Sequence, residues 1–212
     1  MSAYNGNYPP IVPQKIQVQQ VAEADFPTRF GHFRILGFEG QNGGDPEEIV
    51  VLRMGEIVPD RPPLVRIHSQ CLTGDVFHSL RCDCRAQLEL ALEMIAQAGH
   101  GLLIYEPKEG RGIGLLNKLR AYQLQDQGAD TVEANEQLGF EADLRDYEIP
   151  GAILRLLGVT AVRLISNNPE KIAALESAGV EVVERVPALV APHESTEDYL
   201  RTKRDKLGHL LD

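Results

Sequence analysis

Apolar positions in the first third of the chain form short runs that are typical of β-strands. The segments 33–38 (FRILGF), 47–55 (EEIVVLRMG) and 63–69 (PLVRIHS) are apolar, and turn residues border them. The first two flank the sequence GQNGGDP, whose glycine, asparagine and aspartate residues predict a hairpin connection. The front of the molecule is therefore expected to be rich in β structure.

From residue 85 onward, the apolar pattern alternates between helical and strand periods. Leu88, Ala91, Leu92 and Ile95 recur on one face of a predicted helix that stops at Gly99. The same patterns predict helices over 115–128, 150–158 and 167–179, and strands over 101–106, 160–166 and 180–186.

Polar residues indicate where two of the helices begin. Asn168 has the residue type of an N-cap, and Pro169 that of a first helical position. Ser195 and Asp198 form an acidic variant of the capping box, which predicts a last helix beginning near Thr196.

The domain organisation follows from the same patterns. Residues 1–17 contain three prolines and little apolar periodicity, which indicates a flexible N-terminal tail. Residues 18–212 show no internal repeat and no linker, so they are expected to form a single domain. The alternation of elements predicts an α/β fold, with a mixed β-sheet packed by helices and a β-rich N-terminal part.

Composition and charge narrow the function classes. No apolar run reaches the roughly 18 residues of a membrane span, and the N-terminus lacks the apolar region of a signal peptide, so we expect a soluble, cytoplasmic protein. The net charge of −10 disfavours a nucleic-acid partner. Residues 61–120 nevertheless carry eight basic and six acidic side chains. This excess of +2 suits a small anionic ligand, although a solvated charged face has the same signature.

All three cysteines, Cys71, Cys82 and Cys84, lie within fourteen residues. An odd number this close together is a poor disulfide framework, and the spacing differs from that of ferredoxin-type clusters. A catalytic zinc site takes three protein ligands and one water, so the count favours an open zinc site. Two alternatives remain: His68 or His78 completes a closed structural site, or the cysteines are buried without metal.

A glycine-rich segment, KEGRGIGL at 108–115, follows a predicted strand and leads into a predicted helix. Backbone N–H groups at such a helix start bind anions, and Arg111 adds a bidentate phosphate donor. Gly110, Gly112 and Gly114 match neither the dinucleotide fingerprint nor the Walker spacing. An ordinary tight turn is the alternative.

Two further polar stretches carry candidate chemistry. Asp143 and Arg145 are two positions apart, so on an extended segment they would face the same way. Ser166 and Lys171 border the predicted helix start at SNNPEK, which is a plausible anion site. A surface ion pair and a solvated helix end are the corresponding alternatives.

In this order, the motifs RIHSQCLTGD, SLRCDC, EGRGIGLLNK, DTVEANEQLGF, DLRDY, SNNPEK and YLRTKRDKLGHLL resemble GTP cyclohydrolase II. The resemblance runs from about Val21 to Leu211. It implies a hydrolase that acts on a cyclic amidine of GTP and catalyses the first committed step of riboflavin biosynthesis. The implied products are 2,5-diamino-6-ribosylamino-4(3H)-pyrimidinone 5′-phosphate, formate and pyrophosphate. The family also implies one Zn²⁺ per chain, Mg²⁺ at the triphosphate and a homodimer.

The resemblance assigns roles to individual positions. Cys71, Cys82 and Cys84 would bind zinc, Asp143 would accept a proton, and Arg145 would be the nucleophile at the α-phosphorus. A tyrosine at position 122 would support full formate release, because relatives that retain the formamide lack it. The implied GTP contacts are Arg66, Ile67, His68, Ser69, Gln70, Gln87, Glu109, Gly110, Arg111, Thr131, Ser166 and Lys171.

The chain departs from the family pattern at Gln70, where glutamate is expected, and at Arg85, where glycine is expected. Arg81 and Arg85 flank the thiolates and are candidate cations for them. Two other functions share these motifs: a cyclohydrolase that retains the formamide, and a nucleotide-binding protein without catalysis.

Overall fold

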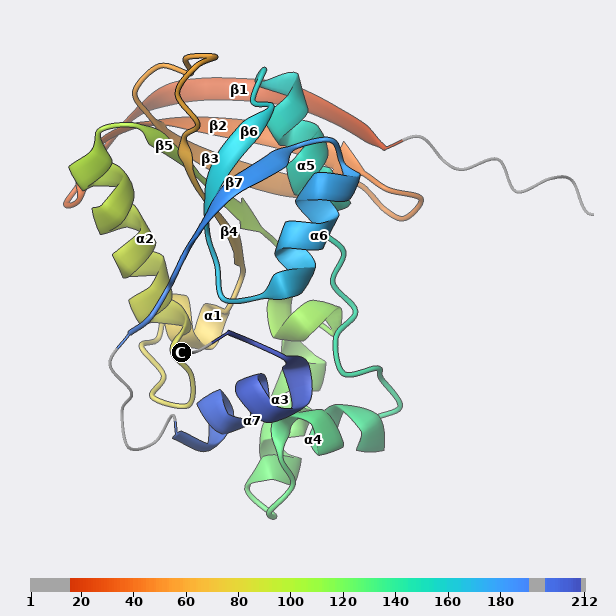
Figure 1. Cartoon of the computed structure of the whole chain (residues 1–212). Coiled ribbons are helices and arrows are strands. Elements are labelled where there is room, and N and C mark those ends of the chain that lie inside the picture. The colour runs from red at the N-terminus through yellow and green to blue at the C-terminus, as the bar shows by residue number, and fades with distance from the viewer. Residues whose placement is uncertain (1–15, 191–196, 211–212) are drawn as a thin grey trace, which may run out of the picture.

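A computed structural model describes residues 16–190 and 197–210, and a seven-stranded sheet is its central feature (Figure 1). The strands are β1 (Gln17–Thr28), β2 (Gly31–Gln41), β3 (Glu47–Met54), β4 (Leu64–Ser69), β5 (Gly101–Glu106), β6 (Ala161–Ile165) and β7 (Glu181–Val186). The helices are α1 (Leu72–Asp75), α2 (Cys84–Ala98), α3 (Leu115–Gln125), α4 (Thr131–Gln137), α5 (Glu148–Leu156), α6 (Pro169–Ser177) and α7 (Glu197–Leu207), with a 3₁₀ turn η1 (Glu109–Gly112).

The sheet has the order β1-β2-β3-β5-β4-β6-β7. Strands β1, β2, β3 and β5 pair antiparallel, whereas β5, β4, β6 and β7 pair parallel. The predicted α/β class, with a mixed sheet and a β-rich N-terminal part, is therefore confirmed.

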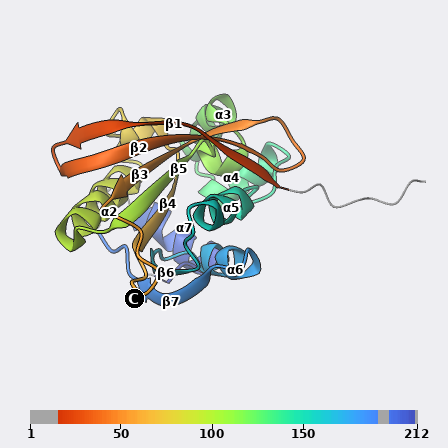
Figure 2. The ribbon, with the colours of Figure 1, turned by 90° about the horizontal axis from the view of Figure 1, so that it is seen from above.

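Helices cover both faces of the sheet (Figure 2). On one face, α2 buries Ala91, Leu92 and Ile95 in a cluster that includes Leu103 of β5. On the other face, α5 and α6 pack Ile153 and other apolar residues against the sheet. The apolar stripe predicted for α2 is thus the surface that it buries.

Most predicted elements are present, but strand β1 and the helices α1 and α4 were not predicted. Strand β1 has no fully buried residue, and only Val18 and Phe26 pack against the core, so its sequence gives a weak apolar signal. It pairs with β2 from Gln17↔Gln41 to Thr28↔Gly31. Helix α4 was missed although Asp130 and Glu133 form a capping box at its start, a signal readable in the sequence.

The predicted helix ends can be compared where the structure describes them. The side chain of Asn168 accepts a hydrogen bond from the N–H of Glu170, and Pro169 occupies the first turn of α6, as predicted. The Ser195 cap and most of the 1–17 tail lie outside the described residues, and β1 begins at Gln17. In the described ranges, no helix is long and apolar enough to cross a membrane.

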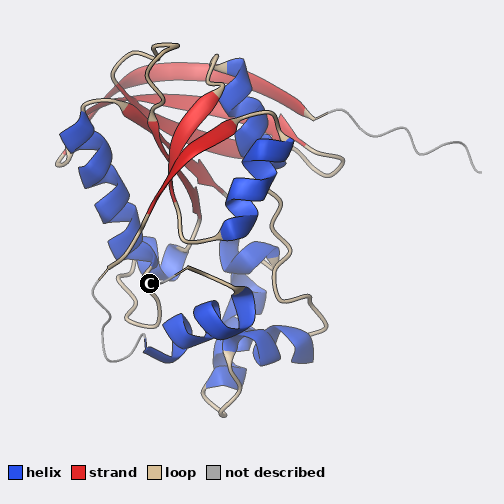
Figure 3. Cartoon of the chain, viewed as in Figure 1, coloured by secondary structure: helices blue, strands red, loops and turns tan. Residues whose placement is uncertain are grey.

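The parallel strands bring their carboxyl ends to one edge of the sheet, the usual position of ligand sites in such folds. The segments that follow β4, β5 and β6 all begin at this edge. Helices α3, α4 and α7 lie beyond it, opposite the sheet (Figure 3). The three motif-bearing loops therefore meet between the sheet and these helices.

Candidate active site

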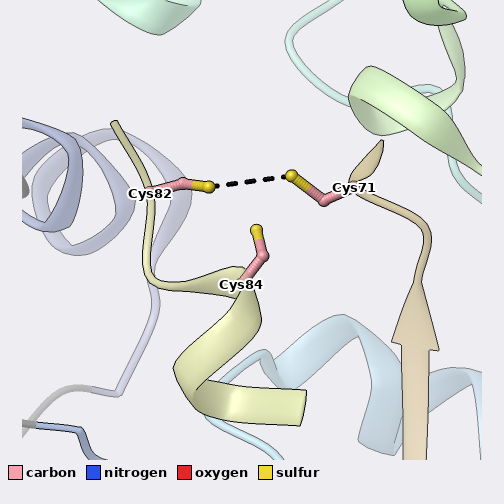
Figure 4. Close-up of side chains that lie close together, drawn as sticks. All are labelled: Cys71, Cys82 and Cys84. Carbon is pink, nitrogen blue, oxygen red and sulfur yellow. Dashed lines mark hydrogen bonds between the residues drawn. The ribbon is translucent and has the colours of Figure 1, made fainter. Parts of the chain in front are cut away.

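The three cysteines converge at this edge from separate segments. Cys71 follows β4, Cys82 lies in the loop before α2, and Cys84 is the first residue of α2; their sulfurs point toward one another (Figure 4). All three sulfurs lie within 4.8 Å of one another, and the Sγ atoms of Cys71 and Cys82 are 3.6 Å apart. Tetrahedral zinc, with Zn–S bonds of about 2.3 Å, separates its sulfurs by about 3.8 Å. The residues present fit zinc.

Neither candidate histidine joins this cluster among the described residues. The Nε2 atom of His68 lies 3.1 and 3.2 Å from the two carboxylate oxygens of Asp75, and His78 is exposed. The closed Cys₃His arrangement is therefore not formed, and the geometry favours the open site.

The electrostatics of the cluster suit a divalent cation. Hydrogen bonds from Cys82 and Cys84, together with the charge of Lys118, hold the pKa of the Cys71 thiol far below its ordinary value. Their hydrogen bonds to Cys71 raise the pKa of Cys82 to about 11 and hold the pKa of Cys84 well above its ordinary value. Because three adjacent thiols resist full ionisation, binding of a cation would release the remaining protons.

The cation nearest these sulfurs is Lys118, to which the sequence reasoning gave no role. Its Nζ lies 3.1 Å from Cys71 Sγ and donates to Glu109 at 2.7 Å. Arg81 instead pairs with Asp126, and Arg85 pairs with Glu89. The sequence did contain a signal for Lys118: it lies one helical turn before the predicted site residue Tyr122 on α3, so the two side chains share a helix face.

Gly74 provides the space that the cluster occupies. A Cβ atom at this position would lie 2.9 Å from Cys82 Sγ and 3.1 Å from Cys71 Sγ, both closer than van der Waals contact. The glycine in the motif CLTGD is therefore required by the sulfurs.

We expect Gly74→Ala to weaken zinc binding by more than about 10-fold, because the added methyl group must displace two ligands. Competition with a chromophoric chelator measures the affinity. Gly44→Ala is the matched control, because a Cβ at Gly44 meets no heavy atom within 4 Å. Parental zinc affinity in Gly74→Ala would contradict the packing argument.

The glycine-rich segment forms the η1 turn and presents an unpaired guanidinium. Gly110 and Arg111 both adopt left-handed φ values, 60° and 61°. Arg111 is not glycine, so this conformation costs roughly 1–2 kcal/mol. Both Nη atoms of Arg111 are buried and have no hydrogen-bond partner among the described residues. Buried donors of this kind require a partner, and an anion satisfies them best.

Asp143 and Arg145 form a half-buried ion pair. Arg145 donates from Nε to Asp143 Oδ1 at 2.8 Å, and its Nη2 contacts the second carboxylate oxygen. Burial opposes the ionisation of both groups, but their mutual contact outweighs it. The pKa of Asp143 is lowered and that of Arg145 is raised. The pair is therefore not the surface ion pair that the sequence left open as the alternative.

The buried carboxylate of Glu106 is linked to the Asp143–Arg145 pair through the hydroxyl of Ser69. Arg145 Nη1 donates to Ser69 Oγ at 3.3 Å, and Ser69 Oγ donates to Glu106 Oε1 at 2.7 Å. Glu106 is 1% exposed, and burial raises its pKa. Glu106 was not predicted as a site residue, because it is the last residue of the predicted strand at 101–106 and carries no motif of its own.

One open cavity joins these groups. The predicted site residues that line it are Arg66, His68, Ser69, Gln70, Cys71, Cys82, Cys84, Gln87, Glu109, Gly110, Arg111, Tyr122, Thr131, Arg145, Ser166 and Lys171.

Two predicted residues do not line the cavity. The side chain of Ile67 is buried in the apolar core, because successive residues of β4 face opposite sides of the sheet. Its carbonyl oxygen accepts a hydrogen bond from Lys171 Nζ at 2.8 Å. The backbone of Ile67 therefore helps to hold Lys171, which lines the cavity. Asp143 reaches the cavity only through Arg145.

Other lining residues lie within the motifs of the resemblance, but no individual role was predicted for them. Lys203 and His209, from the C-terminal end of the chain, and Asn135 of α4 all border the cavity. Burial and the charges of Lys203 and Arg145 lower the pKa of His209 to about 3. The cavity wall is therefore strongly cationic, as a polyphosphate ligand requires.

These features define an α/β protein in which a three-cysteine cluster that fits a metal ion borders a cavity lined by cationic side chains. The sequence model of the GTP cyclohydrolase II family matches residues 19–187, and the chain belongs to this family. The chain is 54% identical over 196 residues to GTP cyclohydrolase-2 of Yersinia pseudotuberculosis, covering 92% of this chain and 99% of that protein.

The chain is also similar to longer proteins. It is 53% identical to the riboflavin biosynthesis protein RibBA of Chlorobium phaeovibrioides and 57% identical to that of Aquifex aeolicus. Each alignment covers 92% of this chain but only 47% and 48% of the relative. The chain thus spans about half the length of these RibBA proteins.

Proposed function

We propose that this protein hydrolyses GTP to 2,5-diamino-6-ribosylamino-4(3H)-pyrimidinone 5′-phosphate, formate and pyrophosphate. One observation carries the proposal: the three cysteines, the unpaired Arg111 guanidinium and Arg145 border the same cavity. The cavity therefore offers a metal centre for the base and cations for the phosphates. The similarity to GTP cyclohydrolase-2 proteins supports the same reaction.

Zinc held by the three cysteines would acidify a coordinated water and supply hydroxide for the hydrolysis at C8. Lys118 would offset the negative charge of the thiolates, because its ammonium lies against Cys71. Glu109 holds Lys118 in place and also accepts from the N–H of Leu72, the residue after the first ligand. The guanine would thus face a metal centre whose negative thiolate charge is partly offset by Lys118, which Glu109 holds in place.

The triphosphate would lie against Arg111 and Arg145. Arg111 has two free buried donors, and Arg145 retains its positive charge because Asp143 raises its pKa. A protonated guanidinium stabilises charge that develops at the α-phosphorus. Attack by Arg145 as a nucleophile would require Asp143 to take its proton, which the lowered pKa of Asp143 opposes. Magnesium would accompany the phosphate oxygens.

The test is to incubate the purified full chain with GTP, Zn²⁺ and Mg²⁺ and to identify the products by mass. We expect equal amounts of formate and pyrophosphate per GTP consumed. A pyrimidine that keeps the formyl group would instead assign the formamide-retaining reaction. GTP that binds but stays intact would assign a binding protein without catalysis.

Tyr122→Phe is expected to let a formamide-bearing product accumulate. The Tyr122 hydroxyl lies 3.1 Å from Thr73 Oγ1, which in turn lies 3.6 Å from Cys71 Sγ, so the hydroxyl is close to the metal centre. Loss of that hydroxyl should slow the second hydrolysis and lower the ratio of formate released to GTP consumed by about 10-fold or more. The ratio is independent of total activity. An unchanged ratio would refute this role for Tyr122.

The proposal also includes the assembly and setting of the protein. The family resemblance favours a homodimer in the cytoplasm, with residues 18–212 as one catalytic domain and residues 1–17 as a tail. Nucleic acid is not expected as a partner, since the net charge is −10, and a membrane is not expected because no apolar run is long enough to span one. Sedimentation analysis of the full chain tests the dimer.

A further inference from the structure

Helix α7, near the C-terminus, contacts the metal loop, residues 82–84, through a buried ion pair. Lys203 of α7 donates from Nζ to Asp83 Oδ1 at 2.6 Å, and the two side chains are 10% and 4% exposed. Asp83 lies between the ligands Cys82 and Cys84. The pair thus joins residues 120 positions apart, one of which is the chain neighbour of two candidate metal ligands.

The carboxylate of Asp83 does not cap helix α2, although its position would allow it to. Asp83 occupies the N-cap position of α2, yet its side chain makes no cap hydrogen bond. An aspartate at this position ordinarily caps the helix and contributes about 1 kcal/mol. Here it binds Lys203 and accepts from Gln87 Nε2 instead. The structure favours the long-range contact over the local one.

The same contact extends into the sheet. Gln87 Oε1 accepts a hydrogen bond from Arg66 Nη2 at 2.6 Å, and Arg66 Nη1 donates to the carbonyl of Ile165 at 3.0 Å. Asp83, Gln87, Arg66 and Lys203 are all buried. A buried network of this kind holds its members in one arrangement, because each lost contact leaves a polar group unpaired.

The end of the chain is anchored a second time beyond α7. The N–H of Leu210 donates to the carbonyl of Asn167 at 2.9 Å, in the turn between β6 and α6. Residues 202–210 therefore contact both the metal loop and the turn after β6, and Lys203 and His209 line the cavity between them. Figure 1 shows α7 beside α4, beyond the carboxyl edge of the sheet.

We infer that Lys203 is a positioning residue for the metal centre: by binding Asp83 it holds the Cys82–Cys84 turn in the geometry that binds the metal. This rests on the proposed zinc site and goes beyond it, because Lys203 would act on the ligands through Asp83, the residue between Cys82 and Cys84. Partners of this kind orient the ligands and typically change metal affinity by about 10–100-fold.

The test measures metal binding by the full chain. Zinc affinity is determined by competition with a chromophoric chelator, and Co²⁺ absorption reports the ligand geometry. Lys203→Met keeps the length of the side chain but removes its charge, and it should weaken zinc binding about 10–100-fold and alter the Co²⁺ spectrum. Lys206→Met is the matched control, because Lys206 lies on the same helix, is 41% exposed and pairs with Asp130 and Glu133.

A double-variant cycle separates positioning from general destabilisation. Asp83→Asn keeps the shape of the side chain and should weaken zinc binding as Lys203→Met does. The double variant should be no weaker than the weaker single variant, because both changes break one contact. Lys203→Arg, which restores the charge, should regain part of the affinity.

Parental zinc affinity with an unchanged Co²⁺ spectrum in Lys203→Met would overturn the inference, and so would additive losses in the double variant. If Lys203→Met does not fold, Asp83→Asn decides alone: parental zinc affinity in that variant overturns the inference. A parental protein that binds no zinc would instead refute the proposed metal site.

Discussion

A Cys82→Ser/Cys84→Ser variant is expected to bind no zinc and to release formate from GTP more than about 100-fold more slowly than the parental protein. Serine hydroxyls stay protonated and are poor zinc ligands compared with thiolates. The fold should persist, because α2 is held by Ala91, Leu92 and Ile95 on the sheet rather than by the sulfurs. Elemental analysis, a formate assay and circular dichroism measure the three properties.

The same variant should still cleave GTP slowly to GMP and pyrophosphate. Arg145 and its partner Asp143 are held by Ser69 and Glu106, and none of these contacts includes a cysteine. Two centres would then act on different parts of one substrate. Equal loss of formate and pyrophosphate would contradict this and indicate a single centre.

Glu93→Gln is the control for the cysteine variant, because Glu93 is an exposed residue of the same helix. It should keep parental zinc content and parental formate release. A fall in formate release in this control would show that α2 transmits any surface change to the site.

Arg145→Ala is expected to slow pyrophosphate release by about 100- to 1000-fold, the usual cost of removing a group that stabilises developing charge. Formate release should persist, because the metal centre does not depend on the Asp143 pair. Separate assays of formate and pyrophosphate from one reaction measure both. Arg155→Ala, at an exposed position of α5, is the matched control.

Arg145→Lys distinguishes the two roles open to this residue. Lysine keeps the positive charge but loses the two-point contact with Asp143, so a charge stabiliser should retain part of its effect. A nucleophilic arginine that forms a covalent guanylyl enzyme first would leave both Arg145→Lys and Arg145→Ala unable to release either product. Loss of formate from both variants would therefore refute the charge-stabilising role.

Local patterns of residues determine most of the helices and strands of this fold. Buried strands such as β5 and amphipathic helices such as α2 carry their own burial pattern in the sequence. Asn168 and Pro169 marked a helix start because capping depends on neighbours within a few residues. The cysteine count indicated an open metal site for a similar reason, since the ligand number depends on residue types alone.

Only the tertiary structure decided which distant groups meet. Strand β1 lies in the sheet mainly through backbone pairing, and its two apolar contacts with the core, at Val18 and Phe26, are too few to give a strand pattern. Lys118 reaches Cys71 across 47 positions, and Lys203 reaches Asp83 across 120. Such contacts depend on how whole elements dock, and a local pattern cannot encode a partner that the chain supplies from another element. The sequence by itself therefore determined the elements and the ligand types, and the docking of those elements decided the charges around them.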